Sequence, residues 1–290
     1  MSVKTKEIDL AEFTSLYPLM KGGSVYVSGK YLQSLSSIKK IKLYKIEKGS
    51  AIKAIFPVNA GRKLFINSNL QPPFTQYFNI LTADAANEER EKLNFNESIL
   101  GAYCKFLKEK YPLFSIPLHP YFEDMRNFIW SGVKVKPLYT YTVKINKDEM
   151  DKVNPKIKRK AGEMELKIKN ADLNFKKMFE DIKKAYNGKQ PVNENEYEIF
   201  MKELEQSDLL DVYESENGML VLLKDFENKT IYEFNVFGRE SGPMIYSAIN
   251  FPKYNGWTFD FQGANTKSIA KYKSWFSPSL LKYFRISRFL

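Results

Sequence analysis

Hydrophobic and polar positions alternate along much of the first half of the chain. The alternation runs through residues 41–46 and resumes at 51–56 after a turn-like stretch. A period of two on both sides of a turn predicts a β-hairpin. Residues 87–110 instead carry their apolar side chains at helical spacing, and the helix they predict should end before Tyr111-Pro112. A short strand is expected at 113–118.

The second half mixes the two periods in the same way. Residues 133–145 are β-branched or aromatic at alternate places and predict a long strand between the halves. The patterns after it predict helices at 147–162, 175–186 and 195–205, strands at 210–213, 219–223 and 230–237, a helix from about Gly242 and a strand at Trp257. The fold class is therefore mixed α/β.

The end of the chain is its most informative stretch. An aromatic run from Trp257 stops at Gln262-Gly263, and apolar residues at helical spacing follow through Phe276. This order predicts a buried strand, a polar turn and an amphipathic helix. Ligands in open α/β sheets bind beyond the carboxyl ends of strands, so the turn is a candidate site.

The same stretch resembles a known family. Residues 259–263 (Phe-Asp-Phe-Gln-Gly), 269–276 and 283–286 (Tyr-Phe-Arg-Ile) look like the C-terminal signature of FemABX-like transferases. Residues 137–143 leading into 154–161 match the strand and basic helix that open the family's second domain, and 71–77 match more weakly. Two departures stand out: Gln262 replaces a commonly acidic residue, and Ser277-Pro278 replaces a frequent glycine.

The resemblance implies two tandem acyltransferase (GNAT) folds, each a mixed sheet flanked by helices. We expect a first domain over 1–137 and a second over 138–290, with the last strand, about 280–290, packing on the first domain. It also implies amide-bond formation: an aminoacyl or acyl group moves from an activated donor to an amine, with a peptidoglycan precursor for cell-wall biogenesis as one acceptor. Aminoacyl-tRNA and acyl-CoA are both open as donors, and neither would be a tightly bound cofactor.

Lys273 and Asp260 are the predicted catalytic residues. Lys273 matches the family's lysine near the end of the last helix, where a cation would stabilise the oxyanion formed as an amine attacks. Asp260 lies in an apolar strand, where an unpaired carboxylate is costly. It is either a proton acceptor for the amine or a structural carboxylate, and the sequence leaves both readings open.

Further positions are predicted to bind the substrate or the donor. The substrate-binding candidates are basic or polar residues near the matched segments: Lys158, Arg159, Lys189, Gln262, Asn265, Tyr139 and Tyr141. Arg239 and Gly242 stand where coenzyme A enzymes hold the pyrophosphate on a helix start. Pro243 removes a backbone N–H there, which weakens the coenzyme A reading.

Composition narrows the possibilities further. The chain has 45 basic and 34 acidic residues, one histidine and one cysteine. A net charge of +11 draws anionic partners such as tRNA, a phosphorylated substrate or an anionic membrane surface. A His/Cys metal site is not expected, and neither is a catalytic pair of His119 with Cys104.

Two further expectations concern location and class. We expect a cytoplasmic protein, with a peripheral position at the inner membrane face left open. Two alternatives to the aminoacyltransferase remain. One is an acyl-CoA-dependent N-acyltransferase acting on a lipid or small amine. The other is a catalytically degenerate protein that binds nucleic acid or an anionic membrane.

Overall fold

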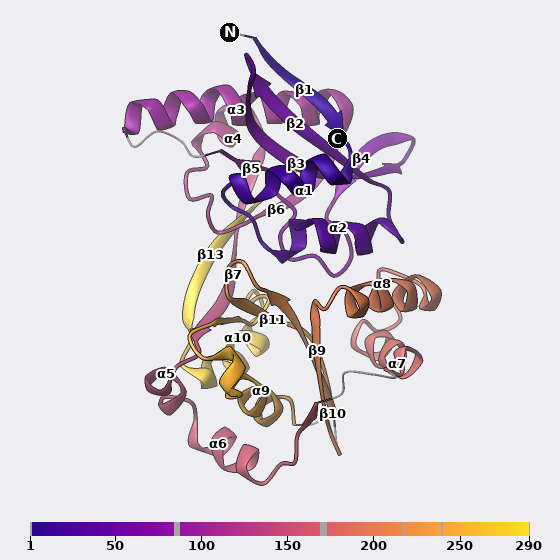
Figure 1. Cartoon of the computed structure of the whole chain (residues 1–290), viewed down its shortest axis with the longest axis vertical. Helices are drawn as coiled ribbons and strands as arrows, with labels where there is room; N and C mark the ends of the chain where they lie inside the picture. The colour runs from indigo at the N-terminus through magenta and orange to yellow at the C-terminus, as the bar shows by residue number, and fades with distance from the viewer. Residues whose placement is uncertain (1, 84–87, 169–172, 217, 239, 290) are drawn as a thin grey trace. The chain divides into compact units, whose positions relative to one another are not determined.

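The computed structural model describes residues 2–83, 88–168, 173–216, 218–238 and 240–289. The chain divides into two compact units, residues 1–137 with 283–290 and residues 138–282. Each unit holds a β-sheet with helices packed against it (Figure 1). The mixed α/β class predicted from the sequence is confirmed.

The sheet of the first unit contains the predicted hairpin. Its strands follow in the order β1 (Val3–Ile8), β2 (Ile41–Lys48), β3 (Ala51–Lys63), β4 (Ile66–Leu70), β6 (Leu113–Leu118) and β13 (Ser279–Arg288), and β5 (Leu81–Thr82) pairs with β3. The pairs are antiparallel except β4 with β6, which run parallel from Ser68↔Leu113 to Leu70↔Ser115. The last strand of the chain joins β6 between Phe284 and Arg288.

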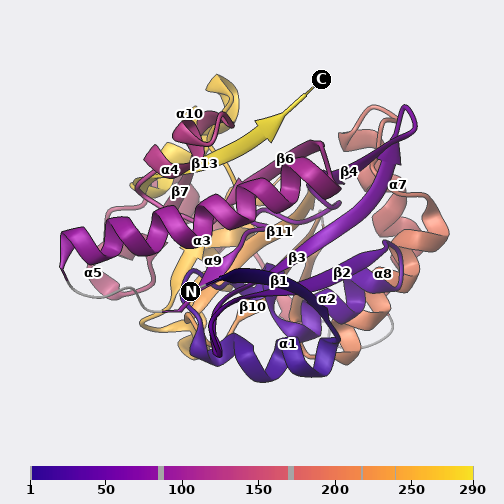
Figure 2. The ribbon, with the colours of Figure 1, turned by 90° about the horizontal axis from the view of Figure 1, so that it is seen from above.

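Helices cover both faces of this first sheet. The predicted helix over 87–110 is α3 (Glu89–Lys110), which packs on one face, while α1 (Leu10–Leu16) and α2 (Gly29–Ser36) lie on the other (Figure 2). Short helical turns complete the unit: η1 (Tyr17–Leu19), η2 (Val25–Val27) and α4 (Arg126–Trp130). Buried aromatic rings join sheet and helix, because Phe56 stacks on Tyr44 and meets Tyr103 edge-on at 4.8 Å between centroids.

The hairpin between β3 and β4 has an unusual turn. Its two central residues are Leu64 and Phe65, with φ angles of 51° and 65°. A two-residue hairpin loop with both φ values positive is a type I′ turn, which Asn-Gly favours because side chains crowd the left-handed region. Leu64 and Phe65 are nevertheless almost fully exposed. No packing within the described residues compensates for this backbone conformation.

The strain in this turn gives a stability prediction. The double variant Leu64→Asn/Phe65→Gly is expected to raise the free energy of unfolding by about 1–2 kcal/mol, because both residues then suit positive φ. Urea denaturation of the variant and wild type measures the difference. A lower midpoint in the variant would show that the two exposed side chains stabilise the fold.

The sheet of the second unit carries the predicted strands in a connected order. It runs β7 (Lys134–Lys144), β12 (Thr258–Asp260), β11 (Thr230–Gly238), β10 (Gly218–Asp225), β9 (Leu210–Ser215) and β8 (Lys167–Ile168). Among the strand pairs of this unit that the structure describes, β11 with β12 is the parallel one. Both units thus contain one parallel strand pair joined through a helix, β4–α3–β6 in the first and β11–α9–β12 in the second.

Helices also cover both faces of the second sheet. On one face α5 (Lys147–Asp151), α6 (Pro155–Gly162) and α9 (Ser241–Ile249) share a core with β9 to β12. On the other face α7 (Phe175–Ala185) packs on α8 (Glu194–Gln206) (Figure 1). Phe200 of α8 contacts Phe234 of β11. The remaining helical segments are η3 (Pro252–Tyr254), α10 (Lys267–Lys273) and η4 (Ser274–Phe276).

One predicted helix is wrong. Residues 147–162 form two helices, because α6 starts anew at Pro155 behind the N-cap Asn154. Proline suits the first position of a helix, where its fixed φ is favourable and its missing N–H removes no bond. The break leaves the basic residues 156–160 on a short separate helix that packs against α9.

Candidate functional site

The site is built where β11 and β12 cease to pair. Their parallel pairing covers three positions and ends at Tyr232↔Asp260. Beyond it the backbone after β12 follows β7, with Phe261 N donating to Tyr141 O at 2.9 Å. On β11 the register against β10 shifts, so that Phe234 is an extra residue of a β-bulge. Glu233 is therefore the first residue of β11 after its pairing with β12 ends, a point that we call the β11–β12 divergence.

Lys273 reaches this divergence from the end of α10. Its side chain is 9% exposed, and Nζ lies 3.2 Å from Oε2 of Glu233, whose side chain is 10% exposed. The same Nζ donates to the carbonyl oxygens of Phe261 and, at 3.2 Å, of Gly263. Three acceptors match the three N–H groups of a lysine ammonium. The positive charge is thus held in place by the polar turn after β12.

Burial controls the ionisation of Glu233. It raises the pKa of this carboxyl, against the opposing effect of the Lys273 ammonium, and the neighbouring Asp260 charge raises the pKa further. Apart from the ion pair with Lys273, Oε2 forms no hydrogen bond with the residues described. A buried carboxylate with a raised pKa takes up a proton more readily than an exposed glutamate does.

Sequence reasoning missed Glu233 although a signal was present. Glu233 lies between the aromatic residues Tyr232 and Phe234 in a mostly apolar strand, which is the same anomaly that singled out Asp260. Two positions further along β11, Asn235 Nδ2 is buried and has no hydrogen-bond partner among the described residues. These two side chains add a proton acceptor and an amide donor to the predicted set.

Asp260 shapes the turn that holds Lys273. Its Oδ1 accepts hydrogen bonds from Thr140 Oγ1 at 2.6 Å and from the backbone N of Gln262 at 2.8 Å. Gln262 has a positive φ of 53°, and Gly263 N donates to Thr140 Oγ1 at 2.9 Å. The carboxylate therefore fixes the bend that turns the Phe261 and Gly263 carbonyls toward Lys273.

Asn265 continues the same arrangement along β7. Its Oδ1 accepts from Tyr139 N at 2.9 Å and its Nδ2 donates to Tyr139 O at 3.0 Å. The side chain thus pairs with the strand edge as a neighbouring strand would. Tyr141 is partly buried against the core, while the Tyr139 side chain is 37% exposed. The structure brings these tyrosines and Asn265 together with Asp260 and Gln262.

The three basic substrate candidates lie outside this group. Lys158 and Arg159 are on α6, where Lys158 Nζ donates to Asp151 O at 2.9 Å, and Lys189 follows α7 as an exposed residue. Within the described part of the chain, no hydrogen bond or ion pair joins them to Lys273 or Asp260. Their binding roles stay predictions.

The start of α9 was the predicted pyrophosphate site. Arg239 lies outside the described residues. A Cβ on Gly242 would lie 3.2 Å from Tyr272 Oη and 3.5 Å from Ile157 Cδ1, so this glycine allows neighbouring side chains to pack closely. Glu240 precedes the helix and places a carboxylate at its N-terminus, 3.8 Å from Lys160 Nζ.

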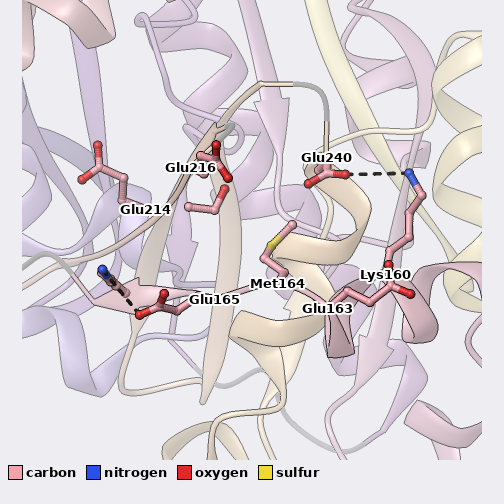
Figure 3. Close-up of a pocket in the computed structure, with 9 residues that line it drawn as sticks. Lys160, Glu163, Met164, Glu165, Glu214, Glu216 and Glu240 are labelled. Carbon is pink, nitrogen blue, oxygen red and sulfur yellow. Dashed lines mark ion pairs between the residues drawn. The ribbon is translucent and has the colours of Figure 1, made fainter.

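A pocket of about 730 Å³ opens beside this helix start (Figure 3). Its described lining is rich in carboxylates: Lys160, Glu163, Met164, Glu165, Lys167, Glu214, Ser215, Glu216 and Glu240. Lys160 pairs with Glu240 and Lys167 with Glu165, so the two cations are already engaged. Five carboxylates repel phosphate, so the described part of this lining does not suit the pyrophosphate of coenzyme A. Neither Lys273 nor Glu233 lines this pocket.

The histidine and the cysteine take no part in the site. Cys104 is buried in α3, and burial raises the pKa of its thiol to about 11, which leaves it protonated at neutral pH. His119 follows β6 in the other unit, where its Nδ1 accepts from Tyr121 N at 3.2 Å. Its ring packs edge-on against Tyr77. Among the described residues, no His/Cys/Asp/Glu cluster could hold a metal ion.

His119 gives a prediction about acid stability. Burial lowers the pKa of its imidazole from 6.5 to about 4, so the unfolded chain binds a proton that the folded state does not. The free energy of unfolding therefore falls by about 2 kcal/mol as the pH falls from 6.5 to 4. This is less than the full pKa difference would give, because the half-buried ring keeps some contact with solvent. As the sole histidine, His119 gives one set of imidazole NMR signals. A titration midpoint near 6.5 would contradict the prediction.

Comparisons with solved structures identify the fold. FemX superposes with a TM-score of 0.66 at 10% identity, over 97% of this chain and 96% of its own. A tandem GNAT protein from the clavulanic acid biosynthesis pathway superposes with a TM-score of 0.59 at 8% identity, over 99% of this chain and 98% of its own. A conserved protein of unknown function from Bacteroides thetaiotaomicron superposes with a TM-score of 0.58 at 12% identity, over 99% of this chain and 100% of its own.

These likenesses confirm the predicted fold. The chain has the FemABX-like, tandem GNAT acyltransferase fold along nearly its whole length. No protein-family model matches the sequence, and no curated protein matches it. In the part of the chain that the structure describes, no helix is both long and apolar enough to cross a bilayer.

Proposed function

We propose that this protein is a FemABX-like transferase that moves an aminoacyl or acyl group from an activated donor to an amine. The observation that carries the proposal is the buried Lys273–Glu233 pair at the β11–β12 divergence. Placing two charges in a nearly closed site is unfavourable, and apolar residues of similar volume would often serve stability as well. A chemical role explains why both charges are there.

The pair suits amide formation because it can handle both a proton and a negative charge. As the amine nitrogen bonds to the donor carbonyl carbon, it releases a proton to Glu233, whose raised pKa favours uptake. Once Glu233 is neutral, its hold on Lys273 weakens and one N–H of the ammonium becomes available to the developing oxyanion. When the bond to the leaving oxygen or sulfur breaks, that atom takes the proton from Glu233.

The start of α9 favours an aminoacyl ester as donor over a coenzyme A thioester. Glu240 adds negative charge at the helix N-terminus, Pro243 supplies no N–H, and the pocket beside them is rich in carboxylates. An aminoacyl-tRNA donor needs no pyrophosphate site at this helix. Basic side chains on α6, the half-buried Lys158 and the exposed Arg159 among them, offer contacts for the phosphates of RNA. The proposed acceptor is the amine of a peptidoglycan precursor.

The test is a product assay with the two donors in parallel. Purified protein is incubated with alanyl-tRNA or with acetyl-CoA and a panel of amines that includes a lysine-containing muramoyl pentapeptide, and products are identified by mass spectrometry. An alanyl amide is the expected product. An acetyl amide formed instead would overturn the choice of donor. No amide product from either donor would reject the transferase.

A catalytically degenerate binding protein is the second candidate. The observation that favours it is the full engagement of Lys273, whose three N–H groups already have acceptors within the protein. In that case the pair is a structural ion pair. Retention of tRNA or an anionic lipid through purification, without any amide product, would support this reading over transfer.

A further inference from the structure

The tip of the β3–β4 hairpin combines exposed apolar side chains with a strained backbone. Leu64 is 82% exposed and Phe65 is 101% exposed, so both point into solvent over nearly their whole surface. Their positive φ values are unfavourable for these residue types and would suit Asn-Gly. Neither the turn nor the packing of the unit requires Leu and Phe at these positions, so they serve something outside the described fold.

The charged side chains of the hairpin tip itself are positive. Arg62 and Lys63 precede the two apolar residues, are exposed, and form no ion pair with the described residues. The sequence contains no aspartate or glutamate from residue 48 to residue 83, a stretch that includes the whole hairpin. Lys40 is also close, because Ala60 N donates to Lys40 O at 2.8 Å. An anionic surface therefore meets no repelling carboxylate from this segment.

We propose that this hairpin tip docks on an anionic phospholipid bilayer. Leu64 and Phe65 enter the boundary between headgroups and acyl chains, while Arg62 and Lys63 contact the headgroups. A two-residue tip that protrudes in this way inserts into a fluid surface without a matching groove. Nucleic acid shares the negative charge but offers no apolar phase for Leu64. The proposal is independent of acyl transfer, because it rests on the first unit alone.

The size of the tip defines the kind of binding. Two apolar side chains and two cations give weak, reversible attachment that depends on ionic strength. Binding should therefore require anionic lipid and decline as salt is added. It should also be lost when either the apolar or the basic part of the tip is removed.

The test is co-sedimentation of the full chain with vesicles of phosphatidylcholine mixed with phosphatidylglycerol, and with phosphatidylcholine alone. Leu64→Asn/Phe65→Gly preserves the turn and is expected to weaken binding to the mixed vesicles by at least about tenfold. Arg62→Ser/Lys63→Ser is expected to weaken it by about fivefold per removed charge at low salt.

Leu19→Asn is the matched control, because Leu19 is also an exposed leucine of the first unit, 67% exposed. It lies near the other end of β3: Lys21 bridges to Thr82, and Thr82 pairs with Ala54. At about 3.3 Å per residue, Ala54 is roughly 30 Å along the strand from Leu64. This variant should bind the mixed vesicles as wild type does.

Three results would overturn the proposal. The first is wild-type affinity of the Leu64→Asn/Phe65→Gly variant for the mixed vesicles. The second is equal binding of wild type to vesicles with and without phosphatidylglycerol. The third is a wild-type dimer in size-exclusion chromatography that this variant converts to a monomer, together with no vesicle binding, which would assign the tip to a second copy of the chain.

Discussion

Replacing Lys273 by methionine is expected to lower the single-turnover rate of amide formation by about 10²- to 10³-fold, the usual effect of removing one oxyanion donor. Methionine fills similar space but removes the charge and all three N–H groups. Glu233 can then stay protonated in its buried site, because burial already raises its pKa, so the fold is retained. The rate is measured with the donor and acceptor that give product with wild type.

Lys271→Met is the control for this experiment. Lys271 lies two residues earlier on α10 but is exposed. Its loss should leave the rate within about twofold of wild type, as expected for an exposed lysine away from the reacting atoms. Equal rates for wild type and both variants would exclude Lys273 from the chemistry.

Asp260→Ala is expected to lower the free energy of unfolding by about 3 kcal/mol. The substitution removes the acceptor of two hydrogen bonds from a site that is 3% exposed, and it leaves Thr140 Oγ1 and Gln262 N without that partner. Hydrogen bonds to a charged group contribute about 1.5–3 kcal/mol each, and part of this is recovered by relaxation. Chemical denaturation of variant and wild type measures the loss.

Asp260→Asn separates the two roles that the sequence leaves open. Asparagine keeps the Oδ1 acceptor for Thr140 and Gln262, so a positioning residue tolerates it with most of the rate and stability retained. A proton acceptor does not, because an amide cannot take up the proton. A variant with wild-type stability and a rate reduced more than about a hundredfold would transfer the role of base from Glu233 to Asp260.

Long periodic elements were predictable because their patterns follow from burial on one side. The helix α3 and the hairpin β2–β3 have such patterns, and both agree with the structure. The break at Pro155 was missed because apolar residues on both sides continue the helical spacing. The turn Leu64-Phe65 was also missed, since neither residue is typical of a type I′ turn.

The candidate site was predictable only in part. Asp260, Gln262, Lys273 and Asn265 are close in sequence, so one matched segment located them together. Glu233 is 40 residues before Lys273, and only the parallel pairing of β11 with β12 brings the two side chains together. The pairing register and the β-bulge at Phe234 cannot be obtained from local periodicity.

The pH dependence of amide formation in wild type and Glu233→Gln tests the central claim most directly. If Glu233 accepts the proton, the wild-type rate rises with pH as this carboxyl ionises, at a pH above that of an ordinary glutamate because burial raises the pKa. Glutamine cannot ionise, so the variant should be slower and should lack this rise. A variant whose rate and pH profile both match wild type would contradict the claim that the Lys273–Glu233 pair performs the reaction.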